Sequence, residues 1–301
     1  MKRLSAWLLA MILLLCACGG EESPDAPLPQ NEPIILESLT LECSAPAGSG
    51  SGFPAAANAF GAALQQTLAA EGVEVGAVQV TFSRVDAATI DALGSGGVTL
   101  GMLGLGGALV EQGEVLLALS RNEEEPSCAL LIAGGSEYGK QLAWRTKTTP
   151  LTAEEWSRAR IGAVEGDSVA LAAARQLLHE SAGCTIEEYR GYAAAEELLA
   201  AAQLGEVDAA IIRAEDAENA EDFWALTENA ALYEGTVVLS PAAQALQSER
   251  GRDALRRAFW AAAETDAGRE LLKQYSCGSF AAVSEEEIAA MRDLAMWEEL
   301  G

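Results

Sequence analysis

The sequence predicts an α/β protein made of two similar lobes. A pattern at residues 90–103 returns at residues 199–212: in each copy a helical stripe of apolar residues ends at a glycine, and a short apolar strand follows. Strand-like runs and helical stripes also alternate through most of the chain, which favours mixed sheets flanked by helices. Two such lobes with facing strand ends form a cleft between them, which indicates ligand capture.

The first residues predict export from the cytoplasm. Lys2 and Arg3 precede an apolar run at residues 4–15, which is typical of a secretory signal and short for a membrane span. The run ends at Leu15-Cys16-Ala17-Cys18, which resembles a bacterial lipobox. The resemblance implies that residues 1–17 are a lipoprotein signal peptide and that Cys18 carries the lipid. The alternative is an ordinary signal peptide with two incidental cysteines.

Residues 18–34 are predicted to be the lipidated cysteine and a flexible tether. Acids, prolines and other polar residues fill positions 19–32, so this stretch cannot bury enough apolar surface to fold. Fourteen extended residues reach about 45 Å. We therefore expect an extracytoplasmic protein that a lipid on Cys18 anchors to the bacterial cell membrane without spanning it.

Four cysteines remain after signal cleavage and lipidation. Cys43, Cys128, Cys184 and Cys277 can form up to two disulfides in three connectivities, and free buried thiols are an equal alternative. Their spacing fits no zinc motif, and the chain has a single histidine, His179. We expect no metal site.

The charge balance limits the class of partner. With 45 acidic and 19 basic residues the chain has a net charge of −26, which makes nucleic acid a poor partner. We interpret most of the acids as a solvated surface, with cation binding as the alternative. The charge does not exclude an anionic ligand, because local donors and helix ends determine pocket affinity.

The first lobe is predicted to comprise residues 35–138 and to be completed by residues 236–301. Strands are expected at 33–43, 75–82, 98–103, 115–119 and 128–133, and helices at 54–70 and 86–93. A returning strand at 236–239 and closing helices at 250–264, 266–275 and 284–300 follow the second lobe, the last beginning with a Ser284/Glu287 capping box.

Two glycine-rich loops of the first lobe are candidate ligand contacts. Residues 44–52 lie between the first strand and a helix N-terminus, where backbone N–H groups can hold an anion. Residues 104–107 form a second loop that allows close approach. Neither loop has a Walker Gly-Lys-Ser/Thr ending, so nucleotide binding is unsupported and no cofactor is expected. The alternative is that residues 44–52 are an ordinary loop.

The second lobe is predicted at residues 139–235, entered through the polar stretch 136–149. Strands are expected at 161–164, 189–192 and 207–212, and helices from Ser168 to about residue 181 and at 194–204. Asp167 and Ser168 stand at a helix start, which suits either an ordinary N-cap or a ligand contact. Arg213 ends a strand, and its guanidinium suits carboxylate or phosphoryl oxygens. A surface pair of Arg213 with Glu215 or Asp216 is the alternative.

These residues resemble the phosphate/phosphite/phosphonate ABC-transporter substrate-binding family, which has the type II periplasmic-binding-protein fold. The resemblance spans roughly residues 35–294. Its most specific stretches are residues 204–210, the strand 236–239 with Ser240-Pro241, and residues 265–272 with Phe280 and Val283-Ser284.

The resemblance implies a lipid-tethered receptor that closes its lobes over a small-molecule solute and delivers it to an ABC permease. We expect a monomer. The ligand would be a phosphate, phosphite or phosphonate-type oxyanion, or a non-phosphorus solute. The residues implied as ligand contacts are Ser44, Ser51, Phe53, Gly104, Gly106, Asp167, Ser168 and Arg213.

The chain departs from the family at several of these positions. The family's Ser-Thr-Ser-Gly run reads Asp167-Ser168-Val169-Ala170 here, and Asp167 would repel a phosphoryl dianion. No aromatic residue lies between Gly104 and Glu111, the expected Ser-His pair reads Ala194-Ala195, and Thr99 replaces the first-repeat aspartate. Solute capture survives these departures better than phosphonate specificity does.

Two other functions compete with solute uptake. The same fold can serve as a surface sensor or interaction lipoprotein, which a neighbouring sensor-kinase gene would favour. An enzyme is disfavoured because the chain has no Gly-x-Ser-x-Gly elbow and no histidine motif. Glu165 with Asp167 would form a carboxylate pair only by chance.

Overall fold

The computed structural model describes residues 32–46, 49–121, 128–217, 220, 223–228 and 232–299. The described residues from Ile34 onward form one compact unit. The predicted signal peptide, Cys18 and nearly all of the tether therefore lie outside the described residues. No helix within the described ranges is long and apolar enough to cross a membrane.

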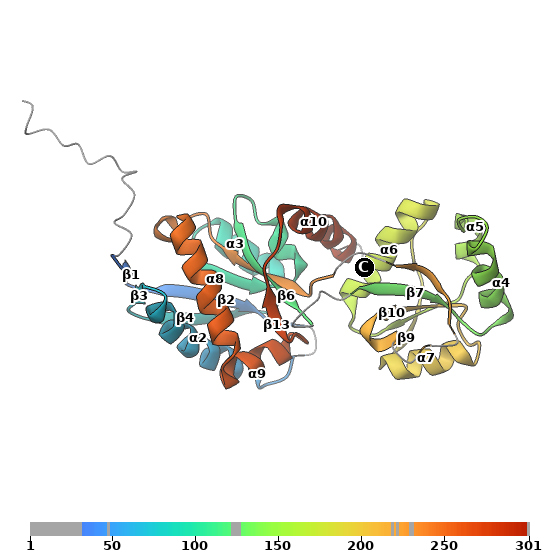
Figure 1. Cartoon of the computed structure of the whole chain (residues 1–301), viewed down its shortest axis with the longest axis horizontal. Coiled ribbons are helices and arrows are strands. Elements are labelled where there is room, and N and C mark those ends of the chain that lie inside the picture. The colour runs from blue at the N-terminus through green and yellow to red at the C-terminus, as the bar shows by residue number, and fades with distance from the viewer. Residues whose placement is uncertain are drawn as a thin grey trace, which may run out of the picture. The chain divides into compact units, whose positions relative to one another are not determined.

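The first lobe is built on a six-stranded mixed sheet (Figure 1). Its strand order is β13-β6-β12-β5-β2-β4, in which β2 is parallel to β4 and β5, and β12 is antiparallel to β5 and β6. The strands are β2 (Leu39–Ser44), β4 (Val78–Ser83), β5 (Leu100–Leu103), β6 (Glu114–Ser120), β12 (Gly235–Leu239) and β13 (Ser279–Ala281). Separately, β1 (Ile34–Leu36) pairs in parallel with β3 (Val73–Val75).

The second lobe repeats this topology in a five-stranded sheet of order β11-β7-β10-β8-β9. Here β8 is parallel to β9 and β10, and β7 is antiparallel to β10, as β12 is to β5 in the first lobe. The strands are β7 (Ala129–Ala133), β8 (Ile161–Val164), β9 (Arg190–Tyr192), β10 (Ala209–Arg213) and β11 (Ala225–Glu228). The structure thus has the predicted two-lobed α/β architecture with mixed sheets.

One strand lies in a different sheet from the one predicted. The apolar run at 128–133 was expected in the first lobe, but β7 pairs with β10 and β11. The chain therefore leaves the first sheet after β6, earlier than residue 138, and re-enters it at β12. A short apolar run fits the interior of either sheet, and its partner in β10 lies about 80 residues later, so local pattern cannot assign it.

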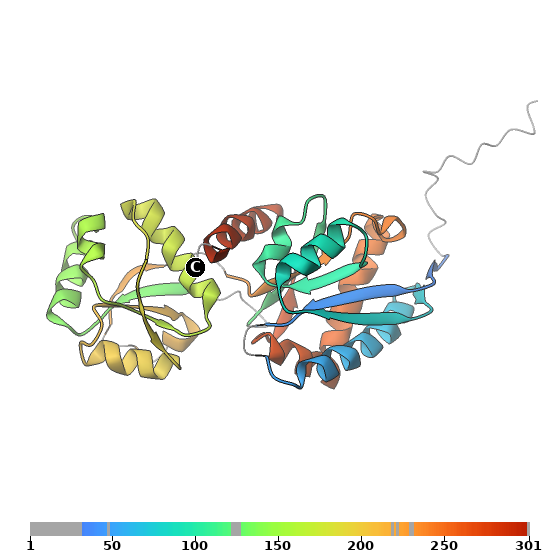
Figure 2. The ribbon, with the colours of Figure 1, turned by 180° about the vertical axis from the view of Figure 1, so that it is seen from behind.

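Helices cover both faces of each sheet (Figure 1, Figure 2). In the first lobe α2, α8 and α9 pack together on one face, and α3 and α10 lie on the other. The helices of this lobe are α2 (Phe53–Ala70), α3 (Asp86–Gly94), α8 (Glu249–Ala263), α9 (Asp266–Gln274) and α10 (Glu285–Glu299). Those of the second lobe are α4 (Glu137–Thr146), α5 (Ala153–Ser157), α6 (Ser168–Ala182) and α7 (Ala195–Gln203).

Local signals explain most helix ends. Proline follows the first residue of α2, and the Thr265 hydroxyl accepts a hydrogen bond from Gly268 N (3.0 Å) at the start of α9. The predicted capping box of α10 is present, because Ser284 N donates to Glu287 (2.8 Å) and Glu287 N to the Ser284 hydroxyl (3.2 Å).

The repeated helix–glycine–strand unit has the same geometry in both lobes. Gly96 follows α3 and Gly205 follows α7, and both take the left-handed backbone conformation with φ of 75° and 74°. The side chain three residues after each glycine contacts the neighbouring strand or the residue that precedes it. Thr99 Oγ1 accepts from Thr40 N (3.2 Å), and Asp208 accepts from Arg160 N (2.8 Å). Thr99 and Asp208 therefore lie at the amino ends of β5 and β10 and join adjacent strands.

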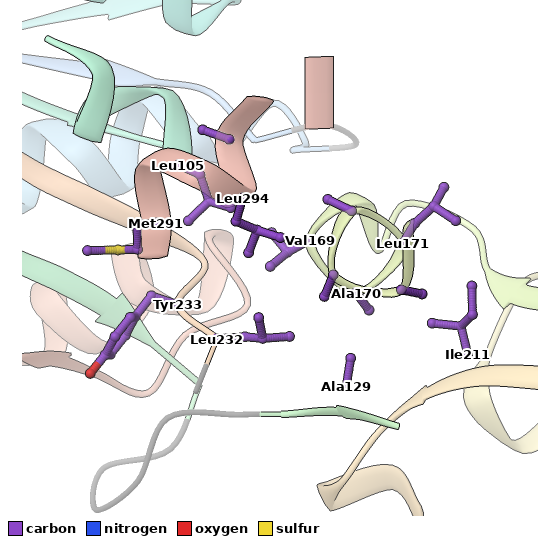
Figure 3. Close-up of a cluster of buried hydrophobic side chains, with 14 of the residues drawn as sticks. Leu105, Ala129, Val169, Ala170, Leu171, Ile211, Leu232, Tyr233, Met291 and Leu294 are labelled. Carbon is purple, nitrogen blue, oxygen red and sulfur yellow. The ribbon is translucent and has the colours of Figure 1, made fainter. Parts of the chain in front are cut away.

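One apolar cluster spans both lobes (Figure 3). Leu105 lies in the 3₁₀ helix η1 (Leu105–Leu109) after β5, Leu294 in α10, and Val169 at the start of α6. All three side chains are buried. The described core is therefore continuous from the first lobe through α10 into the second.

Candidate functional site

The first glycine-rich loop is only partly positioned to meet a ligand. Ser44 ends β2 and is buried, and its carbonyl oxygen accepts a hydrogen bond from the Tyr275 hydroxyl (2.8 Å). Phe53 is also buried, with its ring in edge contact with Tyr275 and Phe82 at centroid distances of 5.7 and 6.2 Å. Ser51 is exposed in the turn before α2. Phe53 therefore packs within the lobe.

The Asp86 carboxyl group occupies the anion donors of this lobe. Asp86 is the first residue of α3, and its carboxyl group lies beside the Ser44 side chain and the Gly104 backbone, whose hydrogen-bonding groups favour its charged form. A Cβ at Gly104 would lie 2.7 Å from Asp86 Oδ2, so glycine allows the close approach there, whereas a Cβ at Gly106 would lie at an ordinary contact distance of 3.5 Å. Burial raises the pKa of Asp86, and these groups offset that only in part.

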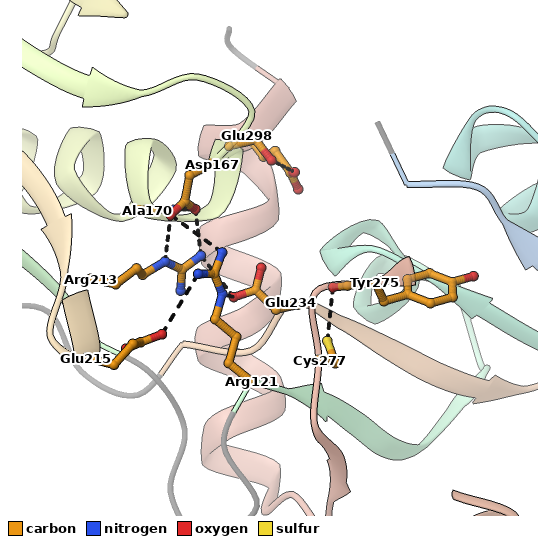
Figure 4. A network of polar contacts seen from close by, with 10 residues as sticks. Arg121, Asp167, Ala170, Arg213, Glu215, Glu234, Tyr275, Cys277 and Glu298 are labelled. Carbon is orange, nitrogen blue, oxygen red and sulfur yellow. Dashed lines mark hydrogen bonds and ion pairs between the residues drawn. The ribbon is translucent and has the colours of Figure 1, made fainter. Parts of the chain in front are cut away.

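In the second lobe Asp167 binds Arg213 (Figure 4). The Asp167 side chain caps α6 by accepting from Ala170 N (3.1 Å). It also forms a bidentate pair with Arg213, with Nε to Oδ2 at 2.8 Å and Nη2 to Oδ1 at 2.6 Å. Arg213 is 1% exposed, so the alternative of a surface pair with Glu215 or Asp216 does not hold: its ion-pair partners are Asp167 and Glu234, whose side chains are 11% exposed. Its Nη1 has no hydrogen-bond partner among the described residues.

Two residues from the segments that join the lobes complete this ion network (Figure 4). Arg121 directly follows β6, and Glu234 directly precedes β12. Glu234 Oε1 lies 2.9 Å from both Arg121 Nε and Arg213 Nη2, and Arg121 lies 3.6 Å from Asp167 and 3.9 Å from Glu215. The network thus links both connecting segments to the carboxyl end of β10 and the start of α6.

The network holds two guanidinium groups against three carboxylates. Burial would raise the pKa of Asp167, but hydrogen bonds and the charges of Arg213 and Arg121 hold it below its ordinary value. Burial raises the pKa of Glu234 against the opposing effect of the same two arginines. Because Asp167 and Glu234 already neutralise Arg213, the guanidinium is not a vacant receptor for an oxyanion.

Ser168 contacts the C-terminal helix. Its hydroxyl donates to Glu298 Oε1 of α10 (2.6 Å). On the same helix, Arg292 Nε donates to the Ala108 carbonyl oxygen of η1 (2.7 Å), and Glu287 accepts from the Tyr233 hydroxyl (2.6 Å). The α10 helix therefore joins the loop after β5, one connecting segment and the start of α6.

The predicted residues form two groups. Ser44, Gly104 and Gly106 surround Asp86, and Asp167 with Ser168 lies beside Arg213 at the start of α6. Within the described residues, Ser51 and Phe53 make no side-chain hydrogen bond or ion pair with either group. Sequence reasoning missed Asp86, Arg121 and Glu234. A signal existed for Asp86, which opens a helix directly after a predicted strand, whereas Arg121 and Glu234 join the network only through tertiary folding.

A hollow of about 330 Å³ lies elsewhere on the first lobe. Ser38, Thr99 and Ser240 are among its lining residues. They lie at the amino ends of β2 and β5 and the carboxyl end of antiparallel β12, opposite the end that carries Ser44 and Gly104. None of the predicted contact residues lines it.

The four cysteines of the described residues are free thiols. Cys43 and Cys277 are buried, and burial raises the pKa of Cys43 to about 12. Of the two alternatives that the sequence left open, the structure has unpaired thiols. Across the described ranges no group of His, Cys, Asp and Glu side chains is placed to hold a metal ion.

No family model matches the chain, and no curated protein is similar to it. Solved structures are similar. XAC2383 from Xanthomonas citri bound to ATP has 12% sequence identity and a TM-score of 0.52, covering 88% of this chain and 98% of that one. Its chloride-bound form has 13% identity and a TM-score of 0.51, covering 87% and 98%. The PhnD1 protein from Prochlorococcus marinus in complex with methylphosphonate has 12% identity and a TM-score of 0.49, covering 86% and 97%.

At these identities the likeness shows the fold alone. The chain has the two-lobed α/β fold of type II periplasmic binding proteins. Ligand identity and anchoring are separate questions.

Proposed function

We propose that this chain is an extracytoplasmic, lipid-anchored solute-binding protein that delivers its ligand to an ABC permease. The observation that carries the proposal is the pair of topologically matched lobes joined by two connecting segments. In folds of this type the ligand binds at the carboxyl ends of the strands, between lobes that close over it. Ser44, Gly104, Asp167, Ser168 and Arg213 all lie at such ends or at the following helix starts.

The lipid anchor and the lobe boundaries remain part of the proposal. The lipobox-like sequence ending in Cys18 and the polar stretch after it support the anchor. Strand pairing favours a first lobe of about residues 34–121 and 235–299, and a second of about 128–228, because β6 and β12 belong to the six-stranded sheet and β7 and β11 to the five-stranded sheet.

The ligand class departs from what the resemblance implies. Neighbouring structures carry methylphosphonate or ATP, which present phosphoryl or phosphonyl oxygens. In this chain the hydroxyl, backbone and guanidinium groups at the strand ends contact the chain's own carboxyl groups, Asp86 and Asp167. A non-phosphorus solute is therefore favoured for this chain.

A thermal-shift screen of the folded body tests solute binding. The panel contains phosphate, phosphite, phosphonates, amino acids and cationic metabolites. A ligand at a hundred times its Kd stabilises the folded state by about 2.7 kcal/mol. A reproducible shift with one class supports the proposal, and no shift with any class contradicts it. Retention of the full chain in the membrane fraction, and its release by Cys18→Ser, tests the anchor.

One observation favours a second function, a surface sensor or interaction lipoprotein. The α10 helix contacts η1 in the first lobe and α6 in the second, so it resists lobe movement. Small-angle scattering with a ligand from the screen separates the two functions. Compaction on binding supports transport by lobe closure, and an unchanged profile favours the sensor.

A further inference from the structure

Each lobe carries one acidic residue beside hydrogen-bond donors at the carboxyl ends of its strands. The Asp86 carboxyl group lies against the Gly104 backbone and beside the Ser44 side chain, and Asp167 accepts from Ala170 N and both Nε and Nη2 of Arg213. Hydroxyl groups, helix-start N–H groups and guanidinium are the donors that hold phosphoryl oxygens in proteins. Both sets of donors are therefore already occupied by covalently attached carboxylates.

The surroundings add negative charge. The two arginines, Arg121 and Arg213, face Asp167, Glu215 and Glu234, and no ion pair to Asp86 is found among the described residues. An incoming dianion would have to displace the two carboxylates from their donors and remain near them. Repulsion between like charges that are close together in a partly buried site strongly opposes the binding of such a dianion.

We propose that Asp86 and Asp167 are the specificity-determining residues of the binding site. By filling the anion donors of their lobes they exclude phosphoryl and other multiply charged oxyanions, and the ligand is a solute of zero or positive net charge. The inference rests on the proposed function and names the ligand class of the same site.

Removal of the two charges tests the inference directly. Asp86→Asn, Asp167→Asn and the double variant keep side-chain size, and asparagine still caps α6. Titration calorimetry with inorganic phosphate and methylphosphonate as probes measures binding. Asp91→Asn, an exposed change on α3, and Glu165→Gln, an exposed change two residues before Asp167, are matched controls.

We expect no measurable binding of either probe to the wild type or the controls. Each single variant should gain affinity about tenfold or more, and the double variant about a hundredfold, with the gain falling as salt rises. Wild-type binding of phosphate as tight as that of the double variant would overturn the inference, as would no gain in any folded variant.

Circular dichroism establishes which variants fold. If Asp167→Asn unfolds because Arg213 loses a buried partner, Asp86→Asn decides the question alone, because no ion pair of Asp86 is lost. The outcomes also separate the inference from the proposed function. Gain of phosphate binding by the variants, with no solute found for the wild type, supports the inference and contradicts the function. Wild-type binding of a phosphorus oxyanion supports the proposed function and contradicts the inference.

Discussion

Asp208 is buried at the amino end of β10 and holds three elements together. Its carboxylate accepts from the Ser136 hydroxyl (2.6 Å), Arg160 N (2.8 Å), Arg160 Nε (3.0 Å) and Arg160 Nη2 (2.8 Å). Ser136 in turn caps α4 by accepting from Gly139 N (2.8 Å). Asp208, the aspartate of the second repeat, is thus a structural residue. In the first lobe the uncharged side chain of Thr99 makes the equivalent hydrogen bond to the neighbouring strand.

We therefore predict that Asp208→Asn lowers the free energy of unfolding by about 2 kcal/mol, the usual cost of losing hydrogen bonds to a buried charged group. Urea denaturation of the folded body measures the loss. Glu206→Gln is the control, because Glu206 is exposed and its pair with Arg190 lies at the surface. Equal losses in the two variants would contradict the structural role of Asp208.

The same carboxyl group gives a pH dependence. Burial opposes its charge, but hydrogen bonds from Arg160 and Ser136 lower the pKa of Asp208 below its ordinary value. A lowered folded-state pKa gives stability that is fully present above the unfolded pKa of about 3.9 and is lost as pH falls through the folded pKa. We expect the difference between wild type and Asp208→Asn to shrink over that acidic range.

At the scale of elements, the helix–glycine–strand unit depends on backbone conformation. Gly205 has a φ of 74°, and a Cβ there would lie 3.0 Å from Ser136 Cα. Gly183, which ends α6 with a φ of 66°, has open space around the same position. Both sites disfavour a side chain through φ, but only Gly205 adds a steric conflict with a neighbouring element.

Gly205→Ala is accordingly expected to destabilise the protein by more than Gly183→Ala does. The conformational cost alone is about 1–2 kcal/mol at each site, and the contact with Ser136 adds to it only at Gly205. Thermal unfolding of the two variants provides the comparison. A larger loss of stability in Gly183→Ala than in Gly205→Ala would show that the tight packing at Gly205 is absent.

Sequence patterns predicted the elements with strong local signals. The α3 and α7 helices, β8 and the cap of α10 lie close to their predicted ranges because glycines, capping residues and periodic apolar residues mark them. The α4 helix was missed because few of its residues are buried, which leaves only a weak apolar stripe in a polar stretch. The prediction that β7 belongs to the first lobe was wrong, because strand pairing depends on residues that are far apart in the sequence.

The candidate site was predictable only in part. Loops and helix starts at the strand ends identified Ser44, Asp167, Ser168 and Arg213, all of which lie in the contacts described above. The sequence could not show that Arg213 is neutralised by Glu234, because 20 intervening residues pass through another strand before the two side chains meet. Thr99, which stands where the resemblance implies an aspartate in the first repeat, lies at the amino end of β5, opposite to these loops.

At the scale of the whole molecule, α10 couples the lobes. Leu294 is buried in the apolar cluster that also contains Leu105 of η1 and Val169 of α6 (Figure 3). The remaining core is divided, with one cluster on the six-stranded sheet and another on the five-stranded sheet. The shared cluster is thus the main apolar link between the two lobes in the described part of the chain.

Leu294→Ala should weaken that link. We expect a loss of about 2–5 kcal/mol, typical of a large-to-small change in a core. We also expect amide exchange of β5 and β10 to become measurable at one common urea concentration in the wild type and at two different urea concentrations in the variant. Met296→Ala on the exposed face of α10 is the control. Coincident exchange of both strands in Leu294→Ala would show that the lobes are coupled by other contacts.

The position of α10 also bears on how the protein is handled in the laboratory. Its last described residues include Glu298, which contacts Ser168 at the start of α6. A purification tag fused directly to the C-terminal end of α10 would lie close to this contact. Such a tag would crowd the proposed binding site and change its charge, and an N-terminal tag ahead of Cys18 would be lost if the signal peptide is cleaved. A tag inserted within the tether avoids both difficulties.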